Sequence, residues 1–224
     1  MNLFLILLFP VLIVFYILIK LEMPGGKEVI FTKIPAAFYG LCSGAVLDAI
    51  YAFFVFSSEY QGNGVAAFAF LDWIPGFIVP SLFFVFFLFW SNDSWKERVE
   101  SYFYFIYPFY AVYLPYFTLK QHYAESFFPV LVRPVVFAVL GMAVARMVLS
   151  VFGKVNEKSW KVIVPSLIIL GISFLPSLLT ALWYFGVNIL VILILSAGAV
   201  ALNLFLAGFN FKEKYNQLKL IFKK

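Results

Sequence analysis

Four charged residues lie inside long apolar stretches of this 224-residue chain: Asp48, Asp72, Arg133 and Arg146. Arg146 lies near the inner end of its segment, and we expect its long side chain to anchor the helix at the cytoplasmic headgroups. A charge at the centre of a membrane-spanning helix costs at least about 2.5 kcal/mol, so the other three residues are expected to be protonated, paired or in contact with water. Carboxylates and guanidinium groups can bind a cation, a proton or a polar solute. We therefore predict a substrate- or ion-binding site formed by Asp48, Asp72 and Arg133 in a polar cavity that opens outward.

Two alternative interpretations assign structural roles to the same residues. At 1.5 Å per residue, Asp48 lies about 13 Å and Arg133 about 6 Å from the outer ends of their segments, so a single buried ion pair could join them and fix helix packing. Asp72 could instead be the N-cap of a helix that begins at Trp73, because Asp is favoured at that position. Residues 65–71 would then be a short interfacial or re-entrant piece.

Tyrosines recur every three residues between positions 104 and 116. Tyr107 and Tyr110 fall deep in this segment, where buried hydroxyl groups need hydrogen-bond partners. We include both in the predicted binding site, because such a stripe can line a pathway or hold an aromatic or cationic ligand. The alternative is that the stripe serves helix packing and the interfacial aromatic belt.

The composition indicates that the solvent of this protein is lipid. Hydrophobic residues make up 64% of the chain and charged residues 12%, and the mean hydropathy is +1.00. Soluble domains carry about 45–50% apolar and about 25% charged residues. These values exclude an ordinary cytoplasmic enzyme, a disordered tail and a secreted disulfide scaffold. Cys42 is the single cysteine and cannot form an internal disulfide.

The chain divides into seven segments long and apolar enough to span a bilayer as helices, and we predict an all-α bundle of about seven transmembrane helices. The segments cover approximately residues 2–19, 36–57, 65–90, 102–118, 129–151, 162–184 and 186–207 of a single domain. The first lacks a basic n-region and a cleavage site, so we expect an uncleaved anchor. The last two should form a tight helical hairpin.

The basic residues predict the orientation of the bundle. With the N-terminus outside and the C-terminus inside, all of the 16 Lys and Arg residues except Lys120 and Arg133 fall on the cytoplasmic side. Cytoplasmic loops carry such an excess. We therefore expect an integral protein of a cytoplasmic (inner) or plasma membrane.

Small residues in two segments predict close helix packing. Gly40 and Gly44 form a small-xxx-small pattern in the second segment, and Gly141 and Ala145 repeat it in the fifth. Such patterns let two helices approach closely. We predict that these two helices cross, which would support an Asp48–Arg133 pair.

The tail, residues 208–224, has the pattern of a basic amphipathic helix. Such a helix lies on the anionic cytoplasmic leaflet, so we predict lipid headgroups as its partner. The predicted lipid-binding residues are Lys212, Lys214, Lys219, Lys223 and Lys224. The basic residues form no stripe suited to a nucleic acid, and we expect none as a partner.

The chain contains no recognisable catalytic motif. His122 is the only histidine, which rules out a His-rich zinc site, and we predict no catalytic residues, metal or cofactor. An enzyme is therefore the less favoured class. The leading interpretation is a small permease or a solute- or ion-binding membrane component. The alternative is a non-catalytic docking subunit of a membrane complex, with a membrane-protein partner or a second copy of the chain.

Overall fold

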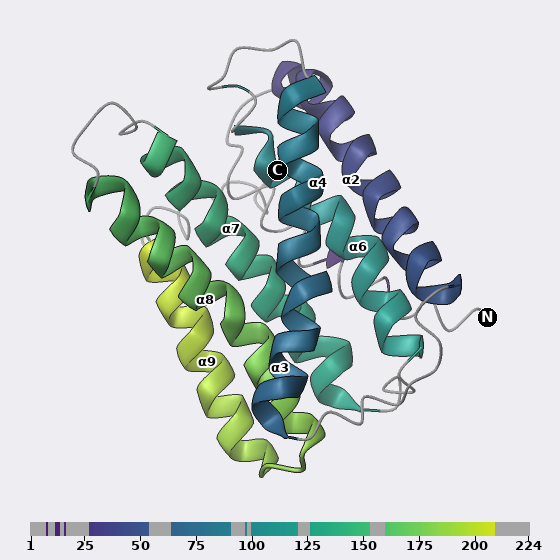
Figure 1. Cartoon of the computed structure of the whole chain (residues 1–224), viewed down its shortest axis with the longest axis vertical. Helices are drawn as coiled ribbons and strands as arrows, with labels where there is room; N and C mark the ends of the chain where they lie inside the picture. The colour runs from purple at the N-terminus through teal and green to yellow at the C-terminus, as the bar shows by residue number, and fades with distance from the viewer. Residues whose placement is uncertain are drawn as a thin grey trace, which may run out of the picture.

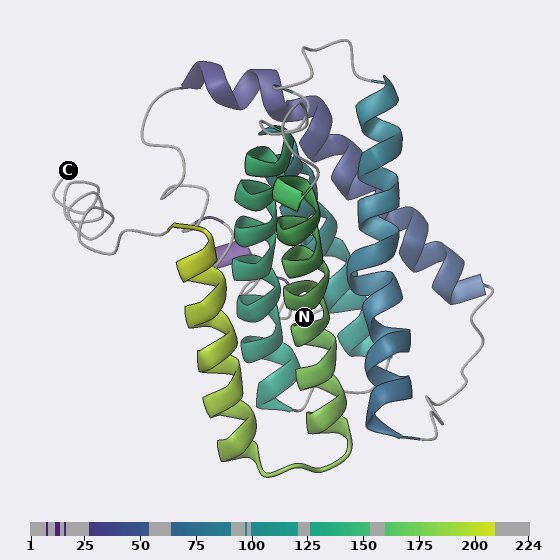
Figure 2. The same cartoon turned by 60° about the vertical axis from the view of Figure 1, so that its left-hand side comes forward.

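The chain folds into a bundle of helices, and a computed structural model describes residues 27–53, 64–90, 100–120, 126–152 and 160–208, with isolated positions at 8, 12, 13, 16 and 97. Within these ranges almost every residue is helical and none is in a strand. Most of the helices run along the long axis of the molecule, and the helix of residues 27–53 crosses them obliquely (Figures 1 and 2). The helical elements are α2 (Lys27–Phe53), α3 (Val65–Trp73), η1 (Ile74–Ile78), α4 (Val79–Trp90), α6 (Tyr102–Lys120), η2 (Phe128–Val132), α7 (Arg133–Phe152), α8 (Trp160–Tyr184) and α9 (Ile189–Leu206), where η marks a π-helical segment.

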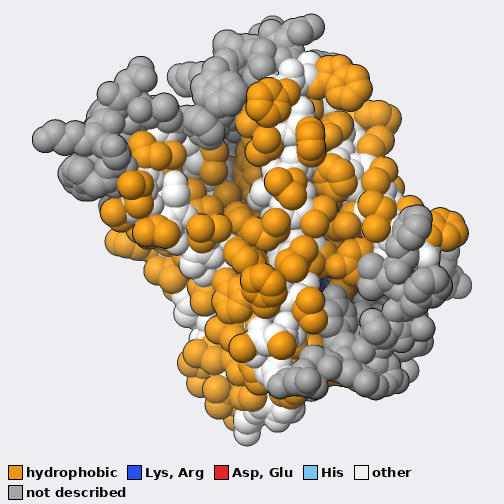
Figure 3. Space-filling view, in the orientation of Figure 1, with side chains coloured by type: hydrophobic (Ala, Val, Ile, Leu, Met, Phe, Trp, Pro, Cys, Tyr) orange, Lys and Arg blue, Asp and Glu red, His pale blue; other side chains and the backbone are white. Residues whose placement is uncertain are grey.

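Five of the described helices are long and apolar enough to cross a membrane: Lys33–Phe53, Val65–Trp90, Phe128–Val148, Val162–Tyr184 and Ile189–Leu206. The face of the molecule seen in Figure 3 is dominated by hydrophobic side chains. These helices support a multi-pass membrane protein. The predicted first span, residues 2–19, and the predicted amphipathic tail lie outside the described ranges, apart from a few single positions.

Residues 65–90 form one continuous helical rod rather than a short piece followed by a new helix. α3 leads into η1, and η1 leads into α4, without a break in helical structure. The prediction that Asp72 caps a helix beginning at Trp73 is therefore wrong, and so is the re-entrant segment at 65–71. The π-helical turn accommodates Pro75 inside the rod, so the proline does not end the helix as its missing N–H group would in a regular α-helix.

α6 is the central helix of the bundle, and almost all of its side chains from Tyr102 to Thr118 are buried or half-buried. The small residues predicted to join the second and fifth spans pack against α6 instead. A Cβ atom added at Gly40 would collide with the carbonyl oxygen of Phe105, and one at Gly44 would lie 3.0 Å from that of Phe109. Gly141 on α7 faces the side chains of Ile106 and Tyr107 on α6.

The two predicted crossing helices, α2 and α7, therefore both use glycine to contact α6. The expectation that they cross each other is wrong, because α6 occupies the place where they would meet. Gly141 and Ala145 are buried as the packing prediction requires, but the partner of Gly141 is the tyrosine-rich helix α6.

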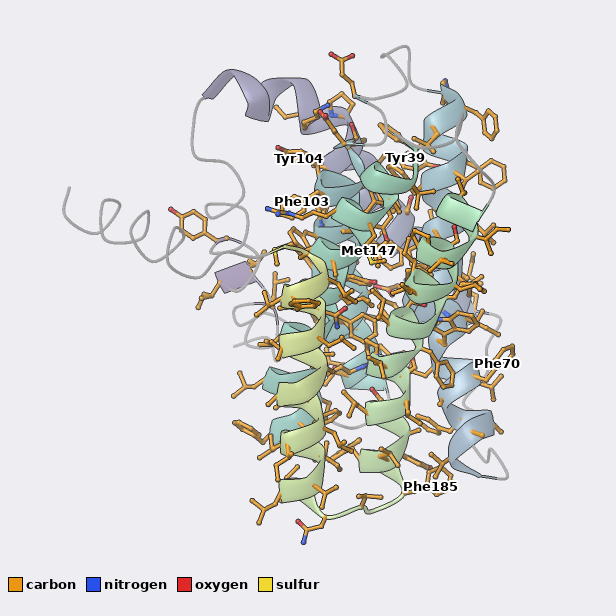
Figure 4. The ribbon with its side chains drawn as sticks, turned by 90° about the vertical axis from the view of Figure 1, so that its left-hand side faces the viewer. Tyr39, Phe70, Phe103, Tyr104, Met147 and Phe185 are labelled. Atoms are coloured by element: carbon orange, nitrogen blue, oxygen red, sulfur yellow. The ribbon has the colours of Figure 1, made fainter. Side chains whose placement is uncertain are left out.

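The last two helices form the predicted tight hairpin. α8 ends at Tyr184, and Gly186 adopts a left-handed φ of 74°, which glycine adopts without steric cost. The Asn188 side chain accepts a hydrogen bond from the backbone N–H of Leu190 and caps α9. We refer to the end of the bundle that holds this turn as the hairpin side; Phe185 marks it in Figure 4.

At the opposite end, two cations bind backbone carbonyls of neighbouring helices. The Lys33 ammonium donates to the carbonyl oxygen of Glu97 at 3.1 Å, just before α6 begins. Arg146 Nη1 donates to the carbonyl oxygen of Ala207 at 2.7 Å, directly after the end of α9. Cations are stabilising at a helix C-terminus. Arg146, predicted to be an anchor at the inner headgroups, thus also holds the end of a second helix.

Candidate functional site: a buried ion pair

An isolated ion pair lies in the interior of the bundle. Arg133 Nη2 is 2.8 Å from Asp72 Oδ1, and the two side chains are 1% and 0% exposed. The pair connects the start of α7 with the end of α3. The hypothesis that Arg133 pairs with Asp48 is therefore wrong: Arg133 does form a buried ion pair, but its partner is Asp72.

Aromatic rings and a hydroxyl group surround the two charges. The guanidinium carbon of Arg133 is 4.5 Å from the ring centroid of Phe117 and 5.3 Å from that of Phe137. Rings at these distances attract a cation through their quadrupole. Ser177 on α8 lies beside the Asp72 carboxylate. The pair thus draws residues from four helices into one cluster.

Both partners of the pair adjoin π-helical backbone. η1 begins two residues after Asp72, and η2 ends at the residue before Arg133. The N–H group of Arg133 itself closes η2 by donating to the carbonyl oxygen of Phe128. Short π-helical turns occur frequently at functional sites. Pro75 and Pro129 each occupy one of the first positions of a π turn, but a proline alone does not distinguish such a turn from the end of a helix, and neither segment was predicted.

Tyr107 and Tyr110 donate hydrogen bonds to backbone carbonyls of the helices beside α6. Tyr107 Oη donates to the carbonyl oxygen of Ala138 on α7 at 3.1 Å, and Tyr110 Oη donates to that of Gly76 in η1 at 3.0 Å. Both tyrosine side chains are 1% exposed. The two hydroxyl groups therefore link the centre of the bundle to the elements that carry Arg133 and Asp72.

Trp73 fixes the helix next to Asp72. Its indole Nε1 donates to Ser173 Oγ on α8 at 2.9 Å, and its ring packs edge-on against Phe174 with centroids 5.8 Å apart. These contacts hold α3 against α8 one residue away from the carboxylate. The Asp72 side chain consequently has a defined position relative to Arg133.

Asp48 is separate from this pair. It lies on the face of α2 that contacts α6 and is 9% exposed. Its Oδ1 atom is buried and has no hydrogen-bond partner among the described residues. The structure therefore brings two of the three predicted charges together and leaves the third on another helix face.

A groove in the described part of the molecule lies between the first half of α7 and α9, not at the ion pair. It has a volume of about 320 Å³ and is lined by apolar side chains from both helices and by Ser196. Within the described ranges, no group of three His, Cys, Asp or Glu side chains is placed to hold a metal ion. The predicted lipid-binding lysines of the tail lie outside those ranges.

The buried cluster offers charged and hydrogen-bonding groups. Asp72 can accept a cation or a proton, and Arg133 can bind an anion, if the pair separates. The Tyr107 and Tyr110 hydroxyl groups already donate to backbone carbonyls. In comparisons with family models, with curated proteins and with solved structures, no match to this chain was found.

Proposed function

We propose that this chain is a small permease, or the solute-binding membrane component of one, in which the Asp72–Arg133 pair is the binding element. The single observation that carries this proposal is an enclosed ion pair whose two partners both adjoin π-helical backbone. Replacing a buried ion pair by well-packed apolar residues is often neutral or stabilising. Stability alone therefore gives little reason for these two charges.

The proposed binding mechanism is exchange of charged partners. A cationic solute or a proton binds Asp72, or an anionic group binds Arg133, and each displaces the other member of the pair. The backbone next to each residue already departs from regular α-helix, so a small change in either π turn would alter the position of the charge. The pair is enclosed at 1% and 0% exposure, and we assign this arrangement to the closed state of an alternating-access cycle.

The alternative function is a docking subunit of a membrane complex. The enclosure of the ion pair favours this alternative, because an ion pair that never opens would serve only to join helices. The small-residue faces of the helices give the docking alternative less support. Gly40, Gly44 and Gly141 contact α6 inside the bundle and leave no room for a partner helix.

The test is a comparison of solute binding and flux between the wild type and pair variants. Wild-type protein in detergent is heated with a panel of small carboxylates, amines, Na⁺, K⁺ and Li⁺, and the melting temperature is recorded. Liposomes containing the protein and a pH-sensitive dye report proton flux. We expect at least one panel member to stabilise the wild type but not the double variant Asp72→Leu/Arg133→Met.

The absence of stabilisation and of flux in the wild type, together with a stable double variant, would contradict the permease proposal and support the docking alternative. Gly171→Ala is the matched control, because a Cβ atom there meets nothing within 4 Å. It should respond to solutes as the wild type does.

A further inference from the structure

Asp48 is a buried carboxylic acid with no charged partner in the described structure. Its side chain is 9% exposed, its Oδ1 atom is inaccessible and accepts no hydrogen bond, and Arg133 is bound to Asp72. Gly40 and Gly44 precede it on the same face of α2 and bring that face against the backbone of α6. The close packing of these two helices therefore covers the side of the carboxyl group that faces α6.

The groups that face Asp48 can be named for each element that packs on α2. α4 carries no titratable side chain. α6 places Tyr116 within electrostatic range of Asp48, and Tyr51 follows one turn further along α2 itself. The cation of α6 is Lys120, its last residue. Among the described residues the ion pair is that of Arg133 with Asp72, so no described cation pairs with Asp48. An ionised carboxylate in this position would therefore lose its hydration without gaining a counter-charge, and such groups become neutral instead.

We propose that Asp48 is a proton-binding site, occupied by a proton at neutral pH. The carboxyl group lies about 8 Å along the helix axis from Phe53, the last residue of α2, at 1.5 Å per residue. A protonated carboxyl is uncharged and can remain at that depth without a cation.

The flank of Asp48 is open to the surroundings of the bundle. Ala45 and Ala52 are its neighbours on the helix surface at three and four residues, and both are exposed. Ala49, the next residue, is exposed as well. Methyl side chains leave little cover over the carboxyl edge, so a small apolar reagent can approach it from the lipid phase. Asp72 differs because it is completely enclosed and ion-paired.

A proton at Asp48 is inferred only from the residues around Asp48. A role for this proton in driving solute movement rests, in addition, on the proposed permease function. A proton that binds and leaves at Asp48 would change the charge on the face joining α2 to α6. α6 also donates the Tyr107 and Tyr110 hydrogen bonds next to the ion pair. The proton site and the solute site thus share one helix.

The experiment uses dicyclohexylcarbodiimide, an apolar reagent that modifies protonated carboxyl groups. Full-length protein in liposomes is treated across a range of pH values, and the adducts are located by peptide mass spectrometry. We expect several-fold more modification at Asp48 than at Asp72 at neutral pH, with a decline as the medium becomes alkaline. Asp48→Asn should abolish that adduct, and Ala199→Gly, a change on another helix, should leave it unchanged.

Infrared spectroscopy gives an independent measurement that needs no reagent access. A carbonyl stretching band of a protonated carboxylic acid should be present in the wild type at neutral pH and absent from Asp48→Asn. Absence of that band from the folded wild type, or equal modification of Asp48 and Asp72, would overturn the inference. If Asp48 carries the proton while no solute binding or flux is detected, the proton site stands and the permease proposal fails.

Discussion

The hydroxyl group of Tyr110 donates a hydrogen bond to the carbonyl oxygen of Gly76 at 3.0 Å, across the boundary between α6 and η1. Four residues after Gly76, Pro80 has no N–H group with which to complete an α-helical bond to that carbonyl. The tyrosine thus replaces a backbone donor that the proline cannot provide. The same hydrogen bond joins the central helix to the helix that carries Asp72.

This relationship predicts the outcome of a double-mutant cycle. Tyr110→Phe should lower the free energy of unfolding by about 1–2 kcal/mol, because a buried carbonyl loses its partner. In a Pro80→Ala background the backbone regains an N–H group, so the same change should cost less. Thermal unfolding in detergent of the four proteins measures the coupling. Equal losses in both backgrounds would show that the two residues act independently.

The ion pair predicts strongly non-additive substitutions. Asp72→Asn or Arg133→Gln alone should destabilise the protein by about 3–5 kcal/mol, because each leaves an uncompensated group in the interior. The double substitution Asp72→Leu/Arg133→Met should be less destabilising than either. Urea or thermal unfolding across the set provides the values, and simple additivity would argue against the pairing.

Substitution of Asp48 is expected not to destabilise the protein, in contrast to substitution of Asp72. Asp48→Leu should leave the melting temperature unchanged or raise it, because the substitution removes a buried oxygen without a partner and introduces an apolar side chain of similar size. The contrast with Asp72→Asn distinguishes the two aspartates. A large loss of stability in Asp48→Leu would indicate that the carboxylate has a partner which the described residues do not include.

Glycine substitutions test the packing of α2 on α6. Gly40→Ala should destabilise the bundle by about 1–3 kcal/mol, because the added methyl group collides with the Phe105 backbone and forces the helices apart. Gly171→Ala meets open space and should be neutral or stabilising by about 0.5–1 kcal/mol from helix propensity. Thermal unfolding of the two variants, measured in parallel, shows whether the steric contact at Gly40 outweighs the gain in helix propensity from alanine.

Gly186 provides a fifth test, in the hairpin. Its φ of 74° lies in the left-handed region, where an alanine costs about 1–2 kcal/mol. Gly186→Ala should therefore lower the melting temperature even though no atom lies near the added methyl group. Gly198→Ala, in regular helix with equal space, is the control and should show no loss.

Hydropathy and length predicted several of the described helices but not how they are joined in space. The start of α2 was missed: it begins at Lys27, not at residue 36, and continues through Pro35. The ranges 65–90, 162–184 and 186–207 match described helices closely, because each is a long apolar run bounded by polar residues or glycine. The small residues Gly40, Gly44 and Gly141 were correctly predicted to lie in close contacts. Their partner was missed, because a small-residue pattern identifies a tight surface without identifying which helix approaches it.

For the charged residues, too, the sequence indicated burial but not the correct partner. A buried, paired Arg133 was one of the two interpretations of the sequence, and the structure shows Arg133 in such a pair, with Asp72 as its partner. The choice of Asp48 as its partner followed from an assumed crossing of two helices. Asp72 was interpreted as a helix cap because its neighbours include proline and glycine, which usually mark an end. A π-helical turn that continues through Pro75 cannot be recognised from those residue types alone.

The π turn within the 65–90 rod shifts the sequence positions that face the interior by one residue. Before the turn the buried positions include Phe68 and Asp72, and after it they include Pro80, Phe84 and Phe87. A regular heptad step from Asp72 would bury residues 79 and 86, so the inward face is displaced by one residue. Deleting one residue between Ile74 and Ile78 would restore ordinary helical phase. It would rotate the carboxylate of Asp72 by roughly 100° relative to α4, and the length of this one turn therefore sets which way Asp72 points.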